Sequence, residues 1–268
     1  MKVLALDYDG VLVDSRKETF AVAYNIYQKL YGFKNLRNGL LSYKNFDRID
    51  NELADVEREF TKLRSFCIIT CNLFSVMSSL DRRMHIEDKQ SFEEYRKTVQ
   101  ETINFRKKFH DERERLQKEN FKEFLKLTPP HASVIKDAKK LMPLFDEVFI
   151  FTANRADLVR NVLKEYGLDL PLRNILDAEF MEKLGRKNKK VMVEHILEMT
   201  KAKPEELIFV EDKLESLENV LGIGIKPFLV DWGFDTKESK EMAKSKGIEV
   251  LNKMNFYNEI TGYLNKLN

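Results

Sequence analysis

The chain has 268 residues, of which 34% are charged and 43% hydrophobic, a composition typical of a soluble globular protein with one large domain or a core plus a smaller one. Its 46 Lys and Arg nearly balance its 44 Asp and Glu, and a net charge of +2 disfavours a protein built mainly to bind nucleic acid. No stretch approaches the ~18 uncharged apolar residues that a membrane span needs, and the sequence does not begin with a signal-peptide pattern. We therefore expect a cytoplasmic protein without nucleic-acid or membrane partners.

The first predicted element is a buried strand, Val3 to Leu6, because this run is entirely apolar. It ends in Asp7 and Asp9, which are followed by Gly10. Carboxylates at the end of a buried strand are costly to desolvate unless a cation or hydrogen bonds compensate. Ligands of open α/β sheets bind at this end of the strands. The segment predicts either a ligand site or an ordinary solvated Asp-Gly turn.

A long helical segment follows, from Ser15 to Thr128, with apolar residues at helical spacing and no convincing strand. Within it, Phe66 to Leu80 predicts a buried helix. Cys67 and Cys71 would share one face of that helix as reduced, buried thiols, as expected in the cytoplasm. A metal or redox pair is the alternative, although no nearby Cys or His completes a set of ligands. The charge run from Arg106 to Lys122 predicts a solvated helix face, with a coiled-coil partner surface as the alternative.

The pattern changes after Thr128-Pro129-Pro130, which breaks the helical run. From there helices alternate with short strands, which predicts βαβ units and a parallel sheet. The expected helices are 132–143, 155–166, 188–201, 214–221, 237–246 and a last C-terminal one; the expected strands are 147–151, 175–180, 206–210, 226–230 and 248–251.

The N-terminal strand has no partner nearby in the sequence, so we expect it to join the later sheet. The predicted fold class is therefore α/β: a Rossmann-like parallel sheet core with an inserted all-α domain. Residues 1–15 plus 129–268 would form the core, and residues 16–128 the insertion.

Three of the predicted strands end in polar residues that share one sheet edge, because the carboxyl ends of parallel strands meet there. These residues are Asp7 and Asp9, Thr152 and Asn154, and Glu211 and Asp212. Four carboxylates cannot crowd together uncompensated, since like charges raise each other's pKa. A hard divalent cation with oxygen ligands is the usual remedy, and Mg²⁺ fits. A Lys would help, and Arg186-Lys187-Asn188-Lys189-Lys190 opens a nearby predicted helix.

These segments resemble the motifs of the haloacid dehalogenase-like phosphatases. Residues 7–15, DYDGVLVDS, are similar to the first motif, D-x-D-G-[TV]-L-x-D-S. Phe149-Ile150-Phe151-Thr152 resembles the second motif, the Lys cluster stands where the third is expected, and Phe209-Val210-Glu211-Asp212 resembles the Glu-Asp form of the fourth. Residues 230–234, VDWGF, are similar to a loop of phosphoglycolate phosphatase-like members. The insertion stands where such proteins carry a helical cap.

The resemblance implies a role for each residue. Asp7 would be the nucleophile that forms an aspartyl-phosphate, and Asp9 the general acid and base. Thr152 would bind the transferring phosphoryl group, assisted by Ala153, Asn154 and Gly10. The metal ligands implied for Mg²⁺ are Asp7, Asp9, Glu211 and Asp212, with the backbone carbonyl of Asp9 facing the metal.

The resemblance also implies that one Lys neutralises the phosphoryl oxygens and Asp7. In relatives the helix after this Lys is apolar at offsets three, four and seven. Counting from Lys189 gives Met192, Val193 and Ile196, which fits. Lys189 is therefore favoured, with Lys187 and Lys190 as alternatives.

The function predicted from these motifs is that of a Mg²⁺-dependent phosphomonoester hydrolase acting on a small phosphorylated metabolite. Because the Glu-Asp form also occurs in β-phosphoglucomutase-like members, a phosphomutase of a small sugar phosphate is the alternative. A non-catalytic binding protein is a third possibility, disfavoured by the intact motif residues. Asp9 disfavours the dehalogenase branch, which lacks that acid. The substrate and the oligomeric state stay open at this point.

Overall fold

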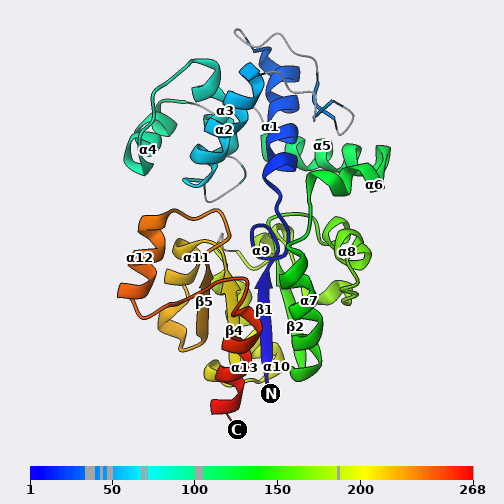
Figure 1. Cartoon of the computed structure of the whole chain (residues 1–268), viewed down its shortest axis with the longest axis vertical. Coiled ribbons are helices and arrows are strands. Elements are labelled where there is room, and N and C mark those ends of the chain that lie inside the picture. Colours follow the sequence, from blue (N-terminus) through cyan, green and yellow to red (C-terminus); the bar gives the residue numbers. More distant parts are fainter. Residues whose placement is uncertain are drawn as a thin grey trace. The chain divides into compact units, whose positions relative to one another are not determined.

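A computed structural model gives the fold and describes residues 1–33, 40–42, 45–46, 51–67, 70, 72–99, 105–185 and 188–267. The chain divides into two compact units, one formed by Met1–Asp14 with Pro130–Asn268 and the other by Ser15–Pro129. We call the first the core unit and the second the helical unit (Figure 1).

The core unit is built on a parallel six-stranded sheet with the strand order β3-β2-β1-β4-β5-β6. The strands are β1 (Val3–Asp7), β2 (Glu147–Phe151), β3 (Ile175–Leu176), β4 (Leu207–Glu211), β5 (Lys226–Val230) and β6 (Glu249–Leu251). The predicted α/β class is confirmed, and the N-terminal strand does join the later sheet, between β2 and β4. All five residues of β1 are buried, as expected for a central strand of a parallel sheet.

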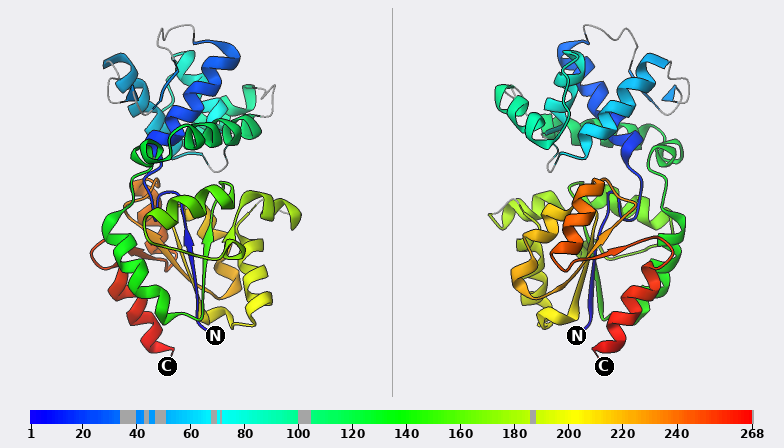
Figure 2. Two further views of the ribbon diagram at one scale, coloured as in Figure 1. Left: turned by 90° about the vertical axis from the view of Figure 1, so that its right-hand side faces the viewer. Right: turned by 60° about the vertical axis from the view of Figure 1, so that its left-hand side comes forward.

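Helices cover both faces of this sheet. They are α7 (Ala132–Leu141), α8 (Ala156–Glu165), α9 (Ala178–Lys183), α10 (Lys190–Thr200), α11 (Leu214–Glu218), α12 (Lys237–Ser245) and α13 (Phe256–Lys266). On one face, Val3 and Ala5 of β1 pack with Val193 of α10 and Leu217 of α11 in a single buried cluster. Helices α7 and α13 lie side by side on the other face (Figure 2).

One predicted strand is wrong in extent. The segment 175–180 forms only a two-residue strand, β3, and then turns into α9. The cause is Asp177, whose carboxylate accepts a hydrogen bond from the Phe180 amide at 2.8 Å and so caps α9 at its N-terminus. The helix expected over 132–143 is also shorter, because Pro143 lies in a separate 3-10 turn, Met142–Leu144. The helix expected over 214–221 ends at Glu218.

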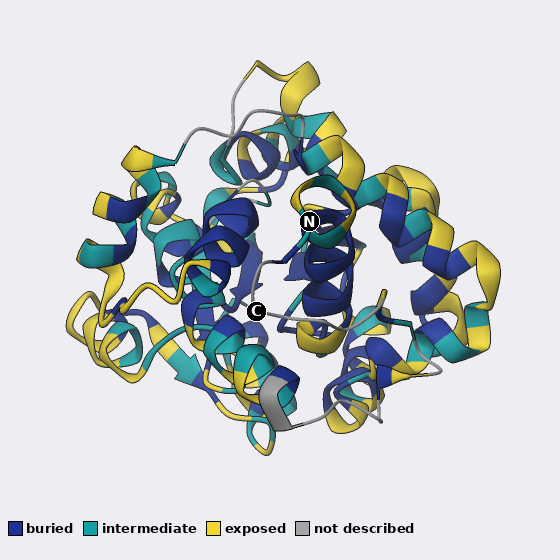
Figure 3. Ribbon diagram, turned by 90° about the horizontal axis from the view of Figure 1, so that it is seen from above, coloured by how far each residue is buried: buried dark blue, intermediate teal, exposed yellow. Residues whose placement is uncertain are grey.

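The helical unit contains helices and no strand among the residues of 15–129 that the structure describes. Its helices are α1 (Arg16–Tyr31), α2 (Asn51–Arg64), α3 (Asn72–Asp81), α4 (Lys89–Thr98), α5 (Phe105–Glu119) and α6 (Phe121–Phe124). Fully buried aromatic side chains, among them Phe20, Phe60 and Phe109, fill its interior. In both units the buried positions face inward and the exposed ones lie on the outer helix faces (Figure 3). No described helix has the length and apolar character needed to cross a membrane.

Two expectations for the helical unit need correction. Phe66 and Cys67 lie before α3, so the predicted helix over 66–80 begins only at Asn72. Cys67 is buried, outside any disulfide and outside that helix, while Cys71 is not among the described residues. The charge run from Arg106 to Lys122 is largely a solvated face of α5, yet Glu112 and Arg113 within it are buried.

Candidate active site

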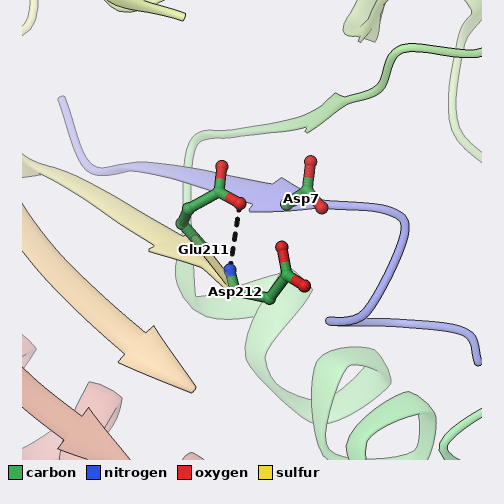
Figure 4. A group of neighbouring side chains, drawn as sticks. All are labelled: Asp7, Glu211 and Asp212. Carbon is green, nitrogen blue, oxygen red and sulfur yellow. Dashed lines mark hydrogen bonds between the residues drawn. The ribbon is translucent and has the colours of Figure 1, made fainter. Parts of the chain in front are cut away.

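Three carboxylates meet where β1 and β4 end. Asp7 is the last residue of β1, Glu211 is the last residue of β4, and Asp212 follows it directly. These two strands pair in parallel, so their carboxyl ends lie next to each other. Each of the three residues offers one carboxylate oxygen, and these oxygens all lie within 4.8 Å of one another (Figure 4). The sheet edge predicted to gather acidic residues therefore does so.

These three residues are buried, with exposed fractions of 4% for Asp7, 0% for Glu211 and 2% for Asp212. Burial, opposed by Lys189 and assisted by Asp212 and Asp9, raises the pKa of Asp7 to about 7. Burial together with the neighbouring charge of Glu211 raises the pKa of Asp212 to about 8. Burial and the charge of Asp7 also raise the pKa of Glu211 above its usual value. The cluster thus resists carrying its full negative charge without a compensating cation.

Among the described residues, Lys189 is the basic side chain that donates hydrogen bonds to this cluster. Lys189 immediately precedes α10, and its Nζ donates to Asp7 Oδ1 and, at 2.5 Å, to Glu211 Oε2. Burial would lower the pKa of Lys189, but the two carboxylates outweigh that effect and hold the pKa above its usual value. Lys190 points elsewhere, 3.8 Å from Glu194, and Lys187 lies outside the described residues.

The donor set fits a divalent cation. Three buried carboxylates facing one ammonium group leave an excess of negative charge, and carboxylate oxygens are the ligands that Mg²⁺ prefers. Glu211 is the most satisfied of the three, because its Oε1 accepts from the amides of Asp212 and Lys213 at 3.0 and 3.1 Å while Oε2 accepts from Lys189. Glu211 is therefore the carboxylate of the three that hydrogen bonds engage most fully.

A second polar group lies at the end of β2. The Thr152 hydroxyl accepts a hydrogen bond from the backbone N–H of Asn154 at 3.0 Å. A hydroxyl that accepts one hydrogen bond can still donate another. The Asn154 side chain donates to Asp9 Oδ2 at 2.9 Å. The other oxygen, Asp9 Oδ1, is buried without a hydrogen-bond partner in the part of the chain that the structure describes. Among the described residues, the Asp9 carboxylate is thus held through one of its two oxygens.

Gly10, one of the predicted phosphoryl-binding residues, shapes the turn after β1. Its amide donates to Val13 O at 2.9 Å inside the turn after β1. Its φ of +87° favours glycine, and a Cβ there would come within 2.3 Å of Asp212 Oδ2. Gly10 therefore allows the turn to approach Asp212 closely. Ala153 is exposed next to Thr152. Phosphoryl binding by Gly10 and Ala153 stays a prediction.

Sequence reasoning singled out the loop 230–234 but gave it no role at the site. In the structure the Phe234 amide donates to Asp212 Oδ2 at 2.9 Å, and the Trp232 indole donates to Val11 O at 3.1 Å. A backbone amide carries no residue-specific signal, so Phe234 could not be found in this way. Gly233, between two aromatic residues at the end of a strand, is the one available clue.

Comparison with known proteins agrees with this architecture. The model of one family, described as haloacid dehalogenase-like hydrolase, matches residues 1–218. The chain therefore belongs to the haloacid dehalogenase-like hydrolases and is an enzyme of that family. A search of curated protein sequences finds no match to this chain.

Several solved structures have folds similar to that of this chain. A predicted phosphoglycolate phosphatase of Haemophilus somnus superposes with a TM-score of 0.63 at 14% identity, covering 97% of this chain and 98% of its own. A haloacid dehalogenase-like hydrolase of Streptococcus pneumoniae gives 0.57 at 13% identity, covering 98% of each chain. A candidate beta-phosphoglucomutase of Thermotoga maritima gives 0.56 at 18% identity, covering 98% and 99%. At these identities the likeness concerns the fold.

Proposed function

We propose that this protein is a Mg²⁺-dependent phosphomonoester hydrolase that acts through an aspartyl-phosphate on Asp7, with a small phosphorylated metabolite as substrate and the cytoplasm as its location. The observation that carries the proposal is the placement of Asp7. It is a buried carboxylate at the end of the central strand, bonded to Lys189 and grouped with Glu211 and Asp212. A carboxylate in such surroundings can act as a nucleophile toward an anionic phosphoryl group once cations neutralise the site.

In the first half of the reaction a carboxylate oxygen of Asp7 attacks the substrate phosphorus, and the bond from phosphorus to the leaving oxygen breaks. Asp9, protonated on Oδ1, gives its proton to that leaving oxygen, so the product departs as an alcohol. Asn154 holds Asp9 by its other oxygen, at 2.9 Å, and so keeps the acid oriented. The Thr152 hydroxyl donates a hydrogen bond to a phosphoryl oxygen.

In the second half a water molecule attacks the phosphorus of the aspartyl-phosphate. Asp9, now ionised, accepts a proton from that water, and the bond between phosphorus and Asp7 breaks. Phosphate leaves, and Asp7 and Asp9 return to their starting forms. Lys189 bonds to Asp7 in the resting site and offsets the negative charge there throughout the cycle.

Asp7 and Asp212, supported by Glu211, would hold Mg²⁺. When bound, the ion supplies positive charge that stabilises the phosphoryl oxygens and permits Asp7 and Asp212 to ionise together. The backbone carbonyl of Asp9 stays a predicted further ligand.

The Asp7→Asn variant tests the proposal. Asn is nearly isosteric and keeps the fold, but its amide cannot attack phosphorus, so turnover of an aryl phosphate with Mg²⁺ should fall by at least about 10³-fold. The matched control is Asp169→Asn, the same change at a position whose side chain is 57% exposed. The control should keep wild-type turnover. Wild-type turnover by Asp7→Asn would contradict the mechanism.

The alternative reaction, transfer of the phosphoryl group to a second sugar hydroxyl, uses the same first half. Product analysis with hexose phosphates separates the two, because a hydrolase yields free phosphate and a mutase yields an isomer. A non-catalytic binding role has no support from the site, in which Asp7, Asp9, Thr152 and Lys189 are all present with hydrogen-bond partners suited to catalysis.

A further inference from the structure

The loop that joins β5 to α12 lies against the candidate active site and has no role in the mechanism above. Residues 231–235 of this loop make hydrogen bonds to two separate segments of the site, the turn after β1 and the segment after β4. We propose that three residues of this loop, Trp232, Gly233 and Phe234, position Asp212 against the turn that follows Asp7 and Asp9. We call these three residues the clamp. The inference rests on the proposed function.

The first end of the clamp is Trp232. Its indole Nε1 donates to Val11 O at 3.1 Å, in the turn that follows Asp9. The ring itself packs edge-on against Phe256 of α13, with centroids 6.0 Å apart, and against His131, 6.5 Å away. Because these contacts fix the ring, the indole N–H is a pre-oriented donor that restrains the turn.

The second end is the Phe234 amide, which donates to Asp212 Oδ2 at 2.9 Å. A backbone hydrogen bond narrows the range of orientations of the carboxylate that accepts it and so helps to direct its remaining lone pairs. The same loop also contacts Leu214, whose backbone N–H donates a hydrogen bond to Asp235 Oδ2 at 2.7 Å. The segment from Asp212 to Leu214 is thus held at both of its ends.

Gly233 makes this approach possible. A Cβ at Gly233 would lie 2.3 Å from the Asp212 Cβ and 3.0 Å from its Oδ2. A Cβ at Gly10, on the turn after β1, would lie 2.3 Å from the same Oδ2. Asp212 is therefore enclosed between two glycines, Gly10 on the turn after β1 and Gly233 in the clamp. Any side chain at either position would displace the carboxylate.

The backbone of Gly233 has no positive φ, so alanine can adopt its conformation without strain. The Gly233→Ala variant consequently tests the displacement of Asp212 by itself. Gly222→Ala is the matched control, since Gly222 also lacks a positive φ and its added Cβ would meet nothing within 4 Å. Trp232→Phe is the second variant, because it removes the indole donor and leaves a smaller aromatic ring that can pack against Phe256.

Mg²⁺ affinity, measured by calorimetry without substrate, is the first readout. Groups that orient metal ligands typically contribute about 10- to 100-fold in metal affinity. We expect Gly233→Ala to bind Mg²⁺ at least about tenfold more weakly than wild type, Trp232→Phe to be weakened in the same direction, and Gly222→Ala to be unchanged. Wild-type affinity in both Gly233→Ala and Trp232→Phe would overturn the clamp.

The second readout needs neither metal nor turnover. Trp232 is the one tryptophan of the chain, so its indole proton gives a single resonance whose exchange with water can be measured. We expect slow exchange in wild type and Gly222→Ala and faster exchange in Gly233→Ala. Equal exchange in all three overturns the clamp. If wild type releases no phosphate from any ester, the proposed function fails, and this exchange measurement still decides whether the clamp exists.

Discussion

The core unit and the helical unit both bury charged side chains, but they do so in opposite ways. In the core unit three buried carboxylates gather around one ammonium group, that of Lys189. In the helical unit, the buried carboxylates of Glu18 and Glu112 are each paired with basic side chains. Glu18 and Arg113, with side chains 1% and 7% exposed, form a two-pronged ion pair at 2.5 and 2.6 Å.

The difference also appears in the protonation of the acids. Burial raises the pKa of Asp7 to about 7, with Lys189 opposing the rise and Asp212 adding to it. Burial acts on Glu112 of the helical unit in the same direction, but hydrogen bonds from Arg115 and Lys29 outweigh it and hold its pKa below the usual value. Buried charges that are fully paired stabilise one packing arrangement. Buried charges of one sign in excess mark a site where a ligand of opposite charge can neutralise them.

The largest stability effect should follow from breaking a pair in the helical unit. Arg113→Met leaves Glu18 buried without its guanidinium partner, and loss of one member of such a pair typically destabilises by about 3–5 kcal/mol. The check is the unfolding free energy from denaturant titration, with backbone hydrogen exchange in α1 and α5. Lys107→Met is the matched control, since its ion pair with Asp111 is 71% and 58% exposed and should contribute less than about 1 kcal/mol. Equal losses in the two variants would show that burial does not distinguish these pairs.

A smaller effect, opposite in sign in the two units, should follow from pH. The folded pKa values of Asp7 and Asp212, about 7 and about 8, lie above those of the unfolded chain. Their contribution to stability is fully present below about pH 4 and is lost as pH rises through the folded values. Glu112 has a lowered folded pKa, so its contribution is present above about pH 4.3 and is lost as pH falls through the folded value.

Hydrogen exchange measured separately in peptides from β1 and β4 and from α1 and α5 checks this contrast in metal-free protein. Between about pH 5 and 8, after correction for the intrinsic exchange rate, the strands should lose protection and the helices should keep it. Asp212→Asn removes one of the titrating acids and should flatten the response of the strands. A strand response identical to that of the helices would contradict the assignment of opposite electrostatics.

Most of the candidate site could be predicted from the sequence, for a definite physical reason. The carboxyl end of a buried strand can be recognised in the sequence where an apolar run gives way to polar residues. A parallel sheet brings these ends to one edge. Asp7, Thr152, Glu211 and Asp212 follow from this rule alone. The helical spacing expected from the family resemblance favoured Lys189, with Lys187 and Lys190 as alternatives, and Lys189 does contact Asp7.

Other features depend on contacts that no local pattern encodes. Arg113 lies in a dense charge run and resembles a solvated residue, yet its partner Glu18 is 95 positions away. The Phe234 amide acts through its backbone, which is the same in every residue except proline. The short strand β3 ends early because Asp177 caps α9, a competition between strand and helix that the apolar pattern of 175–180 does not reveal.

The most direct test of the account is to look for the phosphoryl group on Asp7 itself. Wild-type enzyme mixed with an aryl phosphate and Mg²⁺, quenched in acid within one turnover and analysed by peptide mass spectrometry, should carry one phosphoryl group on Asp7. The Thr152→Ala and Asp9→Asn variants separate binding from proton transfer, and Asp9→Asn should accumulate the phosphorylated form because the attacking water loses its base. Steady release of phosphate without any phosphorylated Asp7, or with the group on another residue, would contradict the account.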